Sequence, residues 1–148
     1  MKILVINGPN INLLGLREPD IYGKEDYSSL CRRVQEKCEK EGIEVKLFQS
    51  NHEGDLIDTL QSARGRADGV ILNAGALSHY SYALADAITA CGLPCVEVHL
   101  SNIFARESFR HESVIAPFCI GTISGFGSFG YHLALAALVE KIKSGAGS

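Results

Sequence analysis

The sequence predicts an α/β fold in which helices cover both faces of a parallel sheet. Two observations favour this fold. Short runs of apolar residues alternate with helical patterns along the whole chain, and the runs are largely continuous, as in strands that are buried on both faces. Because parallel crossovers are right-handed, we expect a doubly wound, flavodoxin-like sheet of five strands in the order 2-1-3-4-5. The 148 residues fit one domain, residues 1–148, and we expect residues 144–148 to form a disordered tail.

The elements of the first half follow in order. A β-branched run predicts the first strand at residues 2–7, and a long polar segment, residues 8–24, comes after it. The first helix is predicted from apolar residues at helical spacing and ends before Gly42. Its buried face comprises Tyr27, Leu30, Cys31, Val34 and Cys38. Residues 43–49 predict the second strand. The second helix is marked by Leu56, Ile57, Leu60 and Ala63.

The second half continues the same alternation. Residues 69–72 predict the third strand, which ends at Asn73, and residues 94–98 predict the fourth, which runs into His99. The fifth strand is expected at residues 119–124. The third helix has a face made of Tyr80, Ala83, Leu84, Ala87 and Ile88. The last helix has a face made of Tyr131, Leu135, Leu138, Val139 and Ile142.

The composition argues against several classes of partner. Hydrophobic residues make up 46% of the chain and charged residues 21%, which is typical of a globular protein. The net charge of −3, without a basic run, argues against a nucleic acid or a membrane as partner. The apolar run at residues 3–6 is too short for a signal peptide or a membrane helix. The five cysteines are odd in number and contain no C-x-x-C, so we expect free thiols and a cytoplasmic location.

Several cofactor motifs are missing from the sequence. The chain contains no G-x-x-x-x-G-K-[ST] phosphate loop, and no G-x-G-x-x-G follows the first strand. The histidines have no H-x-x-x-H spacing and the cysteines no zinc-binding spacing, so we expect no metal site. No lysine falls inside the polar cluster after the third and fourth strands, which argues against a Schiff-base mechanism.

The segment after the first strand contains a candidate base. Connections of this kind usually have about 2–6 residues, and longer ordered ones are often active-site lids. A turn here lets Arg17 and Tyr22 approach each other. A phenol, with a pKa of about 10, is a poor base. One guanidinium about 4 Å away contributes about 4 kcal/mol at an effective dielectric constant of about 20, enough to lower the pKa of Tyr22 by about 2–3 units. The alternative is an ordinary surface turn with a packed tyrosine.

The fourth strand carries a candidate acid. Ligands of doubly wound sheets bind beyond the carboxyl ends of the strands, and strands 1, 3 and 4 are neighbours in the expected order. Glu97 and His99 are two residues apart and share one face of the strand. A carboxylate orients an imidazole and stabilises its protonated form, as a general acid requires. A structural ion pair at the strand end is the alternative.

Further polar residues follow the third and fourth strands. A helix is expected to start near Ser78 or His79, with Ser78 as its cap and free backbone N–H groups facing the ligand crevice. A capping or surface role is the alternative for His79. Ser101 and Asn102 can open another short helix. Arg106 and Arg110 are four residues apart, so a helix would put both on one face, where either could bind a carboxylate through a bidentate fork. Solvated surface arginines are the alternative.

Six motifs in this order resemble the motif set of the type II 3-dehydroquinate dehydratases, and the resemblance covers about residues 2–143. The motifs are Val5-Ile-Asn-Gly-Pro-Asn10-Ile-Asn-Leu-Leu-Gly, Arg17-Glu-Pro-x-x-Tyr22-Gly, Gln49-Ser-Asn-x-Glu-Gly, Ile71-Leu-Asn73-Ala-Gly-Ala, Val96-Glu-Val-His99-Leu-Ser101-Asn, and Phe109-Arg110 with Gly121. The resemblance implies a flavodoxin-like fold, no metal or organic cofactor, and the dehydration of 3-dehydroquinate to 3-dehydroshikimate in the shikimate pathway, by anti elimination through an enolate.

The resemblance also implies roles for individual residues. Tyr22 would take the proton from C2, Arg17 would lower the pKa of Tyr22, and Asn10 would hold a water that stabilises the enolate oxygen. His99, oriented by Glu97, would protonate the departing C1 hydroxyl. The remaining residues would bind substrate: Asn73, His79 and Arg110 through side chains, Leu100 and Ser101 through backbone N–H groups, and Asp86 by reaching a neighbouring subunit's site.

The resemblance implies an assembly as well. The family forms trimers that assemble into dodecamers, so we expect a homododecamer, a tetramer of trimers. A non-catalytic flavin- or nucleotide-binding module of the same fold is the alternative function. It would need a phosphate-binding loop after the first strand, where Pro9 removes a backbone donor.

Overall fold

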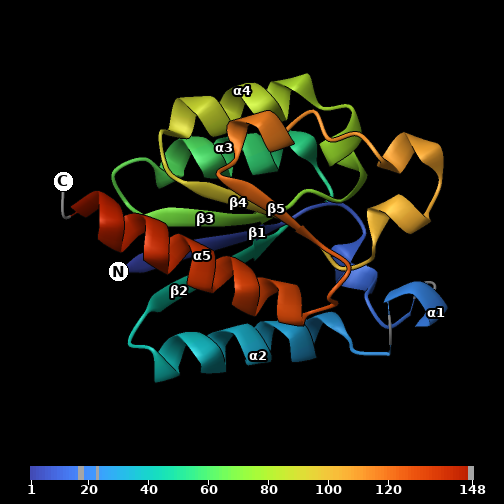
Figure 1. Ribbon diagram of the computed structural model, residues 1–148, viewed down its shortest axis with the longest axis horizontal. Coiled ribbons are helices and arrows are strands. Elements are labelled where there is room, and N and C mark those ends of the chain that lie inside the picture. The colour runs from blue at the N-terminus through green and yellow to red at the C-terminus, as the bar shows by residue number, and fades with distance from the viewer. Residues whose placement is uncertain (17–18, 23, 147–148) are drawn as a thin grey trace.

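One parallel sheet forms the centre of the computed structural model, which describes residues 1–16, 19–22 and 24–146. Its strands within these residues are β1 (Lys2–Asn7), β2 (Glu44–Gln49), β3 (Gly69–Asn73), β4 (Cys95–His99) and β5 (Gly121–Ser124). They lie in the order β2-β1-β3-β4-β5, and each neighbouring pair is parallel (Figure 1). The predicted fold class and strand order are therefore confirmed.

Two pairs of helices cover the two faces of the sheet (Figure 1). One pair is α2 (Tyr27–Lys40) and α5 (Phe129–Ala146), and the other is α3 (Glu53–Ala63) and α4 (Tyr82–Cys91). A short helix, α1 (Pro19–Tyr22), lies in the long segment after β1. The pleat of β1 divides its side chains between two cores: Leu4 and Ile6 pack toward α3 and α4, whereas Ile3 and Val5 pack toward α2 and α5.

The ends of the elements agree with the sequence in places and differ in others. Asp26 caps α2 and accepts from the backbone N–H of Ser29 at 2.8 Å, and Gly42 follows that helix in the left-handed region. Strand β5 begins at Gly121, two residues later than expected, because a 3-10 turn at Ala116–Phe118 precedes it. Helix α5 continues to Ala146, so residues 144–146 of the expected tail are helical, and residues 147–148 lie outside the described residues.

The described part of the chain contains no helix that is long and apolar enough to cross a membrane. Its cysteines are all free thiols, and Cys38, Cys91 and Cys95 are buried in the core.

Candidate active site

A pocket lies at the carboxyl ends of β1, β3 and β4, where the strand order predicted a ligand site. Its wall comes from the segments that follow these strands. Among the residues that line it are Asn10, Asn73, His79, His99, Leu100, Ser101, Arg106 and Arg110. Within the described residues, no three His, Cys, Asp or Glu side chains gather as a metal site requires.

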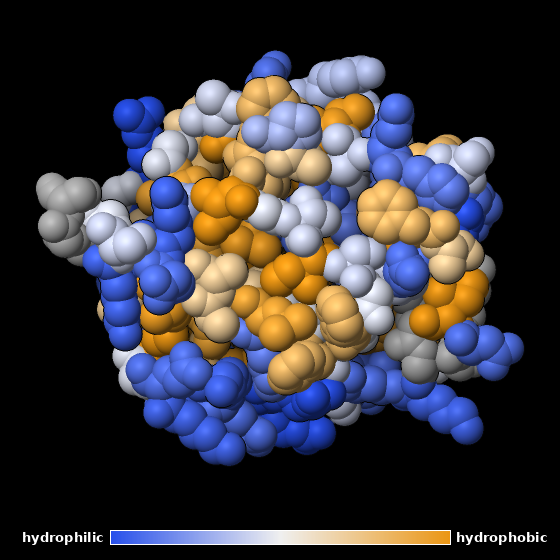
Figure 2. Space-filling model, in the orientation of Figure 1, coloured by the Kyte–Doolittle hydropathy of each residue, from blue (hydrophilic) through white to orange (hydrophobic). Residues whose placement is uncertain are grey.

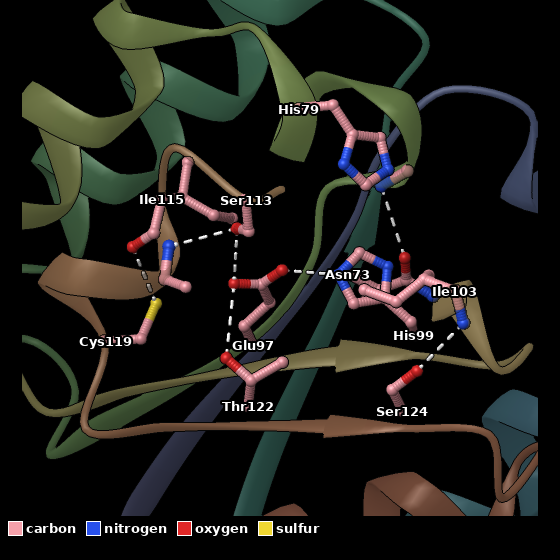
Figure 3. Close-up of polar contacts among 12 residues, drawn as sticks. Asn73, His79, Glu97, His99, Ile103, Ser113, Ile115, Cys119, Thr122 and Ser124 are labelled. Carbon is pink, nitrogen blue, oxygen red and sulfur yellow. Dashed lines mark hydrogen bonds and ion pairs between the residues drawn. The ribbon is translucent and has the colours of Figure 1, made fainter. Parts of the chain in front are cut away.

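An acid cluster, made of Glu97, His99, Ser113 and Thr122, lies at the end of β4 (Figure 3). Glu97 and His99 are 0% and 6% exposed, and the Nε2–H group of His99 donates to Oε2 of Glu97. The other carboxylate oxygen, Oε1, accepts from the hydroxyls of Ser113 at 2.8 Å and Thr122 at 3.5 Å. Three donors thus offset the loss of hydration of a fully buried carboxylate.

The acid cluster uses only one of the two ring nitrogens of His99, so the other can contact a ligand in the pocket. Because Nε2 of His99 is bonded to Glu97, Nδ1 remains for the pocket that His99 lines. In the imidazolium form of the ring both nitrogens carry a proton, so Nδ1 then has one to give. The arrangement can therefore hold a proton at Nδ1 and deliver it to a leaving group.

His79 lies beside His99 with its ring nearly parallel. The ring centroids are 5.9 Å apart and the planes differ by 17°. Nδ1 of His79 lies 2.7 Å from the carbonyl oxygen of Glu112, so Nδ1 carries a proton and donates it. Burial lowers the pKa of His79 below its ordinary value, with smaller contributions from His99 and Arg110, although the Glu112 carbonyl acts in the opposite direction. A neutral His79 with its proton on Nδ1 has Nε2 as an acceptor, which suits a hydroxyl group.

An amide cluster, made of Asn73, Tyr131, Asn7 and Tyr27, lies behind the end of β3. Oδ1 of Asn73 accepts from the backbone N–H of Gly75 at 3.2 Å, and Nδ2 donates to the hydroxyl of Tyr131 at 3.0 Å. That hydroxyl donates to Oδ1 of Asn7 at 2.5 Å. Nδ2 of Asn7 then donates to the hydroxyl of Tyr27 at 3.4 Å. The Asn73 side chain is therefore held from two sides in the pocket wall.

Asn10, after β1, has an unusual backbone conformation. Its φ of +72° lies in the left-handed region, where asparagine is among the few non-glycine residues that occur regularly. Its backbone N–H donates to Oδ1 of Asn51 at 2.9 Å, and the same oxygen accepts from Nε2 of Gln49 at 3.1 Å. These bonds fix the turn, so that the exposed Asn10 side chain lines the pocket.

The arginine segment after β4 differs from the single helix considered above. It forms separate 3-10 turns at Ile103–Ala105 and Ser108–Arg110, and Asn102 caps the first turn as expected. Arg106 and Arg110 still line one pocket, and their side chains are only 9% and 15% exposed. They are therefore not solvated surface arginines. Nε of Arg110 donates to Glu107 at 3.0 Å.

The expected helix cap at Ser78 is wrong. A 3-10 turn at Gly75–His79 comes first, and Ser81 caps α4 by accepting from the backbone N–H of Leu84 at 3.0 Å. Ser78 is instead fully buried within the turn. The extra turn moves the start of the helix past His79, so the pocket wall here is the 3-10 turn and not a helix N-terminus.

Four expected site residues are not among the residues that line the pocket in the described part of the chain. Glu97 is one of them, although it is bonded to His99, which does line the pocket. Arg17 lies outside the described residues. Tyr22 is the last residue of α1, and its side chain lies outside the described part. Asp86 is exposed on α4 and is not among the residues that line the pocket of its own chain.

Ser113, Thr122 and Tyr131 were not identified from the sequence as part of the site. A buried carboxylate needs donors, which is a reason to search for hydroxyls near Glu97, but the sequence does not say which hydroxyls come close. Tyr131 was predicted as part of a buried helical face, and its 1% exposure agrees. Its hydroxyl could have indicated a polar neighbour in the core, because a buried tyrosine usually has a hydrogen-bond partner.

Comparisons with known proteins point to one family. The family model described as dehydroquinase class II matches residues 1–139. A 3-dehydroquinate dehydratase of Bacillus cytotoxicus is 55% identical over 141 residues, which cover 95% of this chain and 97% of the relative. One from Bacillus mycoides is 54% identical over 142 residues, covering 96% and 97% of the two chains.

Solved structures agree with the sequence relatives. The type II dehydroquinase of Butyrivibrio crossotus superposes with a TM-score of 0.92 at 50% identity, covering 94% of this chain and 97% of that one. The type II dehydroquinase of Propionibacterium acnes superposes with a TM-score of 0.90 at 43% identity, covering 94% and 96%.

Proposed function

The chain belongs to the class II dehydroquinase family, and we propose that its pocket dehydrates 3-dehydroquinate by anti elimination through an enolate, giving 3-dehydroshikimate. Membership makes the chain a hydro-lyase and replaces the alternative of a non-catalytic flavin- or nucleotide-binding module. The observation that carries the assignment of steps is the acid cluster, in which a buried imidazole that lines the pocket is bonded to a buried carboxylate. A hydroxyl is a poor leaving group, and this pair can supply the proton it needs.

His99 is the general acid in this proposal. Its Nδ1–H protonates the C1 hydroxyl as the C–O bond breaks, and water leaves. Glu97 accepts from Nε2 and so holds the ring in one orientation while the proton is given up. Ser113 and Thr122 keep the carboxylate hydrogen-bonded while His99 changes its charge.

Tyr22 is the base, and its tyrosinate takes the proton from C2, next to the ketone. Arg17 lowers the pKa of Tyr22 by its positive charge. These two roles rest on the Arg17-Glu-Pro-x-x-Tyr22-Gly motif, since both side chains lie outside the described residues. Charge then develops on the ketone oxygen and must be stabilised. Asn10 holds a water at that oxygen, a role supported by its fixed turn and its exposed side chain in the pocket.

The remaining pocket residues bind the carboxylate and hydroxyls of the substrate. Arg110 and the backbone N–H groups of Leu100 and Ser101 bind the carboxylate, and all three residues line the pocket. Asn73 and His79 bind hydroxyls. The orientation of His79 supports this role, because its Nδ1–H is occupied by Glu112 and Nε2 remains to accept a hydroxyl proton.

Asp86 reaches the site of a neighbouring subunit in a cytoplasmic dodecamer of four trimers. Exposed apolar side chains support an assembly. Figure 2 shows apolar residues gathering over β5 and the start of α5, and β5 is an end strand of the sheet. Phe118, Ile120, Phe126 and Phe129 in this region are 44–60% exposed. Apolar surface of this kind commonly marks a protein–protein interface.

The test is to add 3-dehydroquinate to the purified protein and to follow the ultraviolet absorbance of the conjugated enone product. Absorbance should rise with wild-type protein. It should stay at background with Tyr22→Phe, which keeps the ring but removes the ionisable hydroxyl, and fall by orders of magnitude with His99→Ala. Near-normal turnover by either variant would remove that residue from its role. Sedimentation velocity at micromolar concentration tests the assembly, and a single-subunit mass would contradict it.

A further inference from the structure

Tyr131 is absent from the pocket lining, yet the amide cluster connects it to the pocket wall. We propose that Tyr131 is a positioning residue: its buried hydroxyl fixes the orientation of the Asn73 carboxamide and so makes this wall of the pocket select an alcohol group. The inference rests on the proposed role of Asn73 in binding a substrate hydroxyl.

The hydrogen bonds of the amide cluster run in one direction, which the backbone sets. The N–H of Gly75 can only donate, so the Asn73 atom that faces it is Oδ1, at 3.2 Å. Nδ2 of Asn73 must then face Tyr131 and donate to its hydroxyl oxygen. Tyr131 has one proton, and it goes to Asn7. Asn7 continues the same donor-to-acceptor order, since its own Nδ2 donates to the hydroxyl of Tyr27.

A flipped Asn73 would create two unfavourable contacts. Its Oδ1 would face the Tyr131 oxygen, whose only proton is given to Asn7, and its Nδ2 would face the N–H of Gly75. An exposed asparagine tolerates such a flip because water satisfies either orientation. Asn73 is 2% exposed and Tyr131 is 1% exposed, so here the protein's own donors and acceptors decide the orientation.

The backbone around Asn73 leaves little freedom to escape this constraint. The N–H of Gly8 donates to the Asn73 carbonyl at 2.7 Å, which ties the end of β3 to the end of β1. A Cβ on Gly8 would lie 2.7 Å from the carbonyl oxygen of Ala74, so the two segments are as close as glycine permits. The carboxamide can therefore neither shift nor rotate without losing bonds.

The fixed orientation has a consequence for substrate choice. After its bonds to Gly75 and Tyr131, Asn73 retains one N–H on Nδ2 and one lone pair on Oδ1. An alcohol can accept from the first or donate to the second. A ketone or a carboxylate can use only the N–H. Asn73, held in this way, therefore favours a hydroxyl over the other oxygen groups of a cyclic hydroxy acid.

A double-mutant cycle on the intact enzyme tests the proposal, with Tyr131→Phe, Asn73→Ala and the double variant. Tyr131→Phe removes one oxygen atom and should raise KM about tenfold while kcat changes by less than about threefold, as expected for lost binding of a hydroxyl. The pH profile of kcat should keep its shape. In the Asn73→Ala background, Tyr131→Phe should cost nothing further in kcat/KM, although it still lowers the melting temperature.

Two further variants separate positioning from packing. Asn7→Leu keeps Tyr131 and Asn73 but removes the acceptor of the Tyr131 proton, so that proton competes for Oδ1 of Asn73. Like Tyr131→Phe, Asn7→Leu should raise KM in the wild-type background and have no further effect on KM in the Asn73→Ala background. This variant replaces Tyr131→Phe if the latter does not fold. Tyr27→Phe is the matched control at the far end of the cluster, and it should lower kcat/KM less than Tyr131→Phe does.

Several outcomes would overturn the proposal. They are an unchanged KM for Tyr131→Phe, an equal loss of kcat/KM with and without Asn73, and a Tyr27→Phe loss as large as that of Tyr131→Phe. If Asn73→Ala itself leaves KM unchanged while enone still forms, Asn73 does not bind a hydroxyl and the inference fails with it. Absence of enone from the wild-type protein would instead reject the dehydratase proposal.

Discussion

The acid cluster and the amide cluster both put polar groups into the core behind the pocket, but they differ in charge. The acid cluster contains an ionisable pair, and three donors converge on one carboxylate. The amide cluster contains only amides and phenols, linked in one line from Gly75 to Tyr27. The three converging donors stabilise the negative charge of Glu97, whereas the line of hydrogen bonds fixes the orientation of the Asn73 carboxamide. We therefore expect damage to the acid cluster to appear in proton transfer and damage to the amide cluster to appear in binding.

Among the variants that test this difference between the clusters, Glu97→Gln should have the largest effect. The amide keeps the size of the side chain but removes the negative charge beside the His99 ring, and its NH2 group faces a donor on at least one side. We expect kcat to fall by about 10²–10⁴, the usual contribution of general acid catalysis. Steady-state enone formation measures it. A loss confined to KM would show that the two clusters do not differ in the way proposed.

Gly8→Ala tests how closely the amide cluster is held by the backbone. The added Cβ would lie 2.7 Å from the Ala74 carbonyl oxygen, so the segment after β1 must move away from Asn73. We expect a destabilisation of about 1–3 kcal/mol, typical of overpacking, in urea unfolding. Gly54→Ala is the matched control, because a Cβ there meets nothing within 4 Å and lies in helix α3. Equal unfolding midpoints for the two variants would contradict the close approach.

Ser113→Ala should have a moderate effect on turnover. It removes the 2.8 Å donor to Glu97, and hydrogen bonds to charged groups contribute about 1.5–3 kcal/mol. We expect kcat to fall about tenfold or more. Thr122→Val removes the weaker 3.5 Å donor and should cost less. The test compares the loss of kcat in the two variants, and a larger loss for Thr122→Val would reject this account of the carboxylate.

The smallest expected effect concerns stability in mild acid. Burial lowers the pKa of both His79 and His132 below the ordinary histidine value. The unfolded chain therefore binds protons more readily than the folded chain below about pH 6.5, so stability falls as the pH falls through that range. Unfolding midpoints should be lower at pH 5.5 than at pH 7.5, and His132→Gln should narrow the difference.

The amide cluster supplies the control for this pH effect. Burial raises the pKa of Tyr131 above its ordinary value, so its phenol stays protonated across the range. Tyr131→Phe should lower stability by the same amount at both pH values. An unequal loss would show that the amide cluster is coupled to a titrating group after all.

The fold was predictable because each element has its own local signal. Continuous apolar strands, helical spacing and right-handed crossovers together determine the order β2-β1-β3-β4-β5. Errors arose where a few residues decide between turns. The expected cap moved from Ser78 to Ser81 because the chain makes a 3-10 turn first, and the periodicity of a helix does not predict such a turn.

The position of the pocket was predictable because it follows directly from the strand ends. Asn73 and His99 are the last residues of β3 and β4 and line the pocket, where the topology predicts a ligand, and Glu97 lies two residues before His99 on the same strand. Their supporting residues could not be predicted, because they come from far along the chain. Ser113 is 16 residues from Glu97, and Tyr131 is 58 residues from Asn73, so only the folded packing brings them together.

The positions of these supports along the chain have a consequence for synthesis on the ribosome. Every described residue that lines the pocket precedes His111, whereas Ser113, Thr122 and Tyr131 all come later. A chain released before helix α5 is translated would contain the whole pocket lining, but its Asn73 would lack the phenol partner. Translation must therefore continue well past the last pocket residue before the pocket has all of its supporting residues. A premature stop codon directly after the pocket residues would still disable the enzyme.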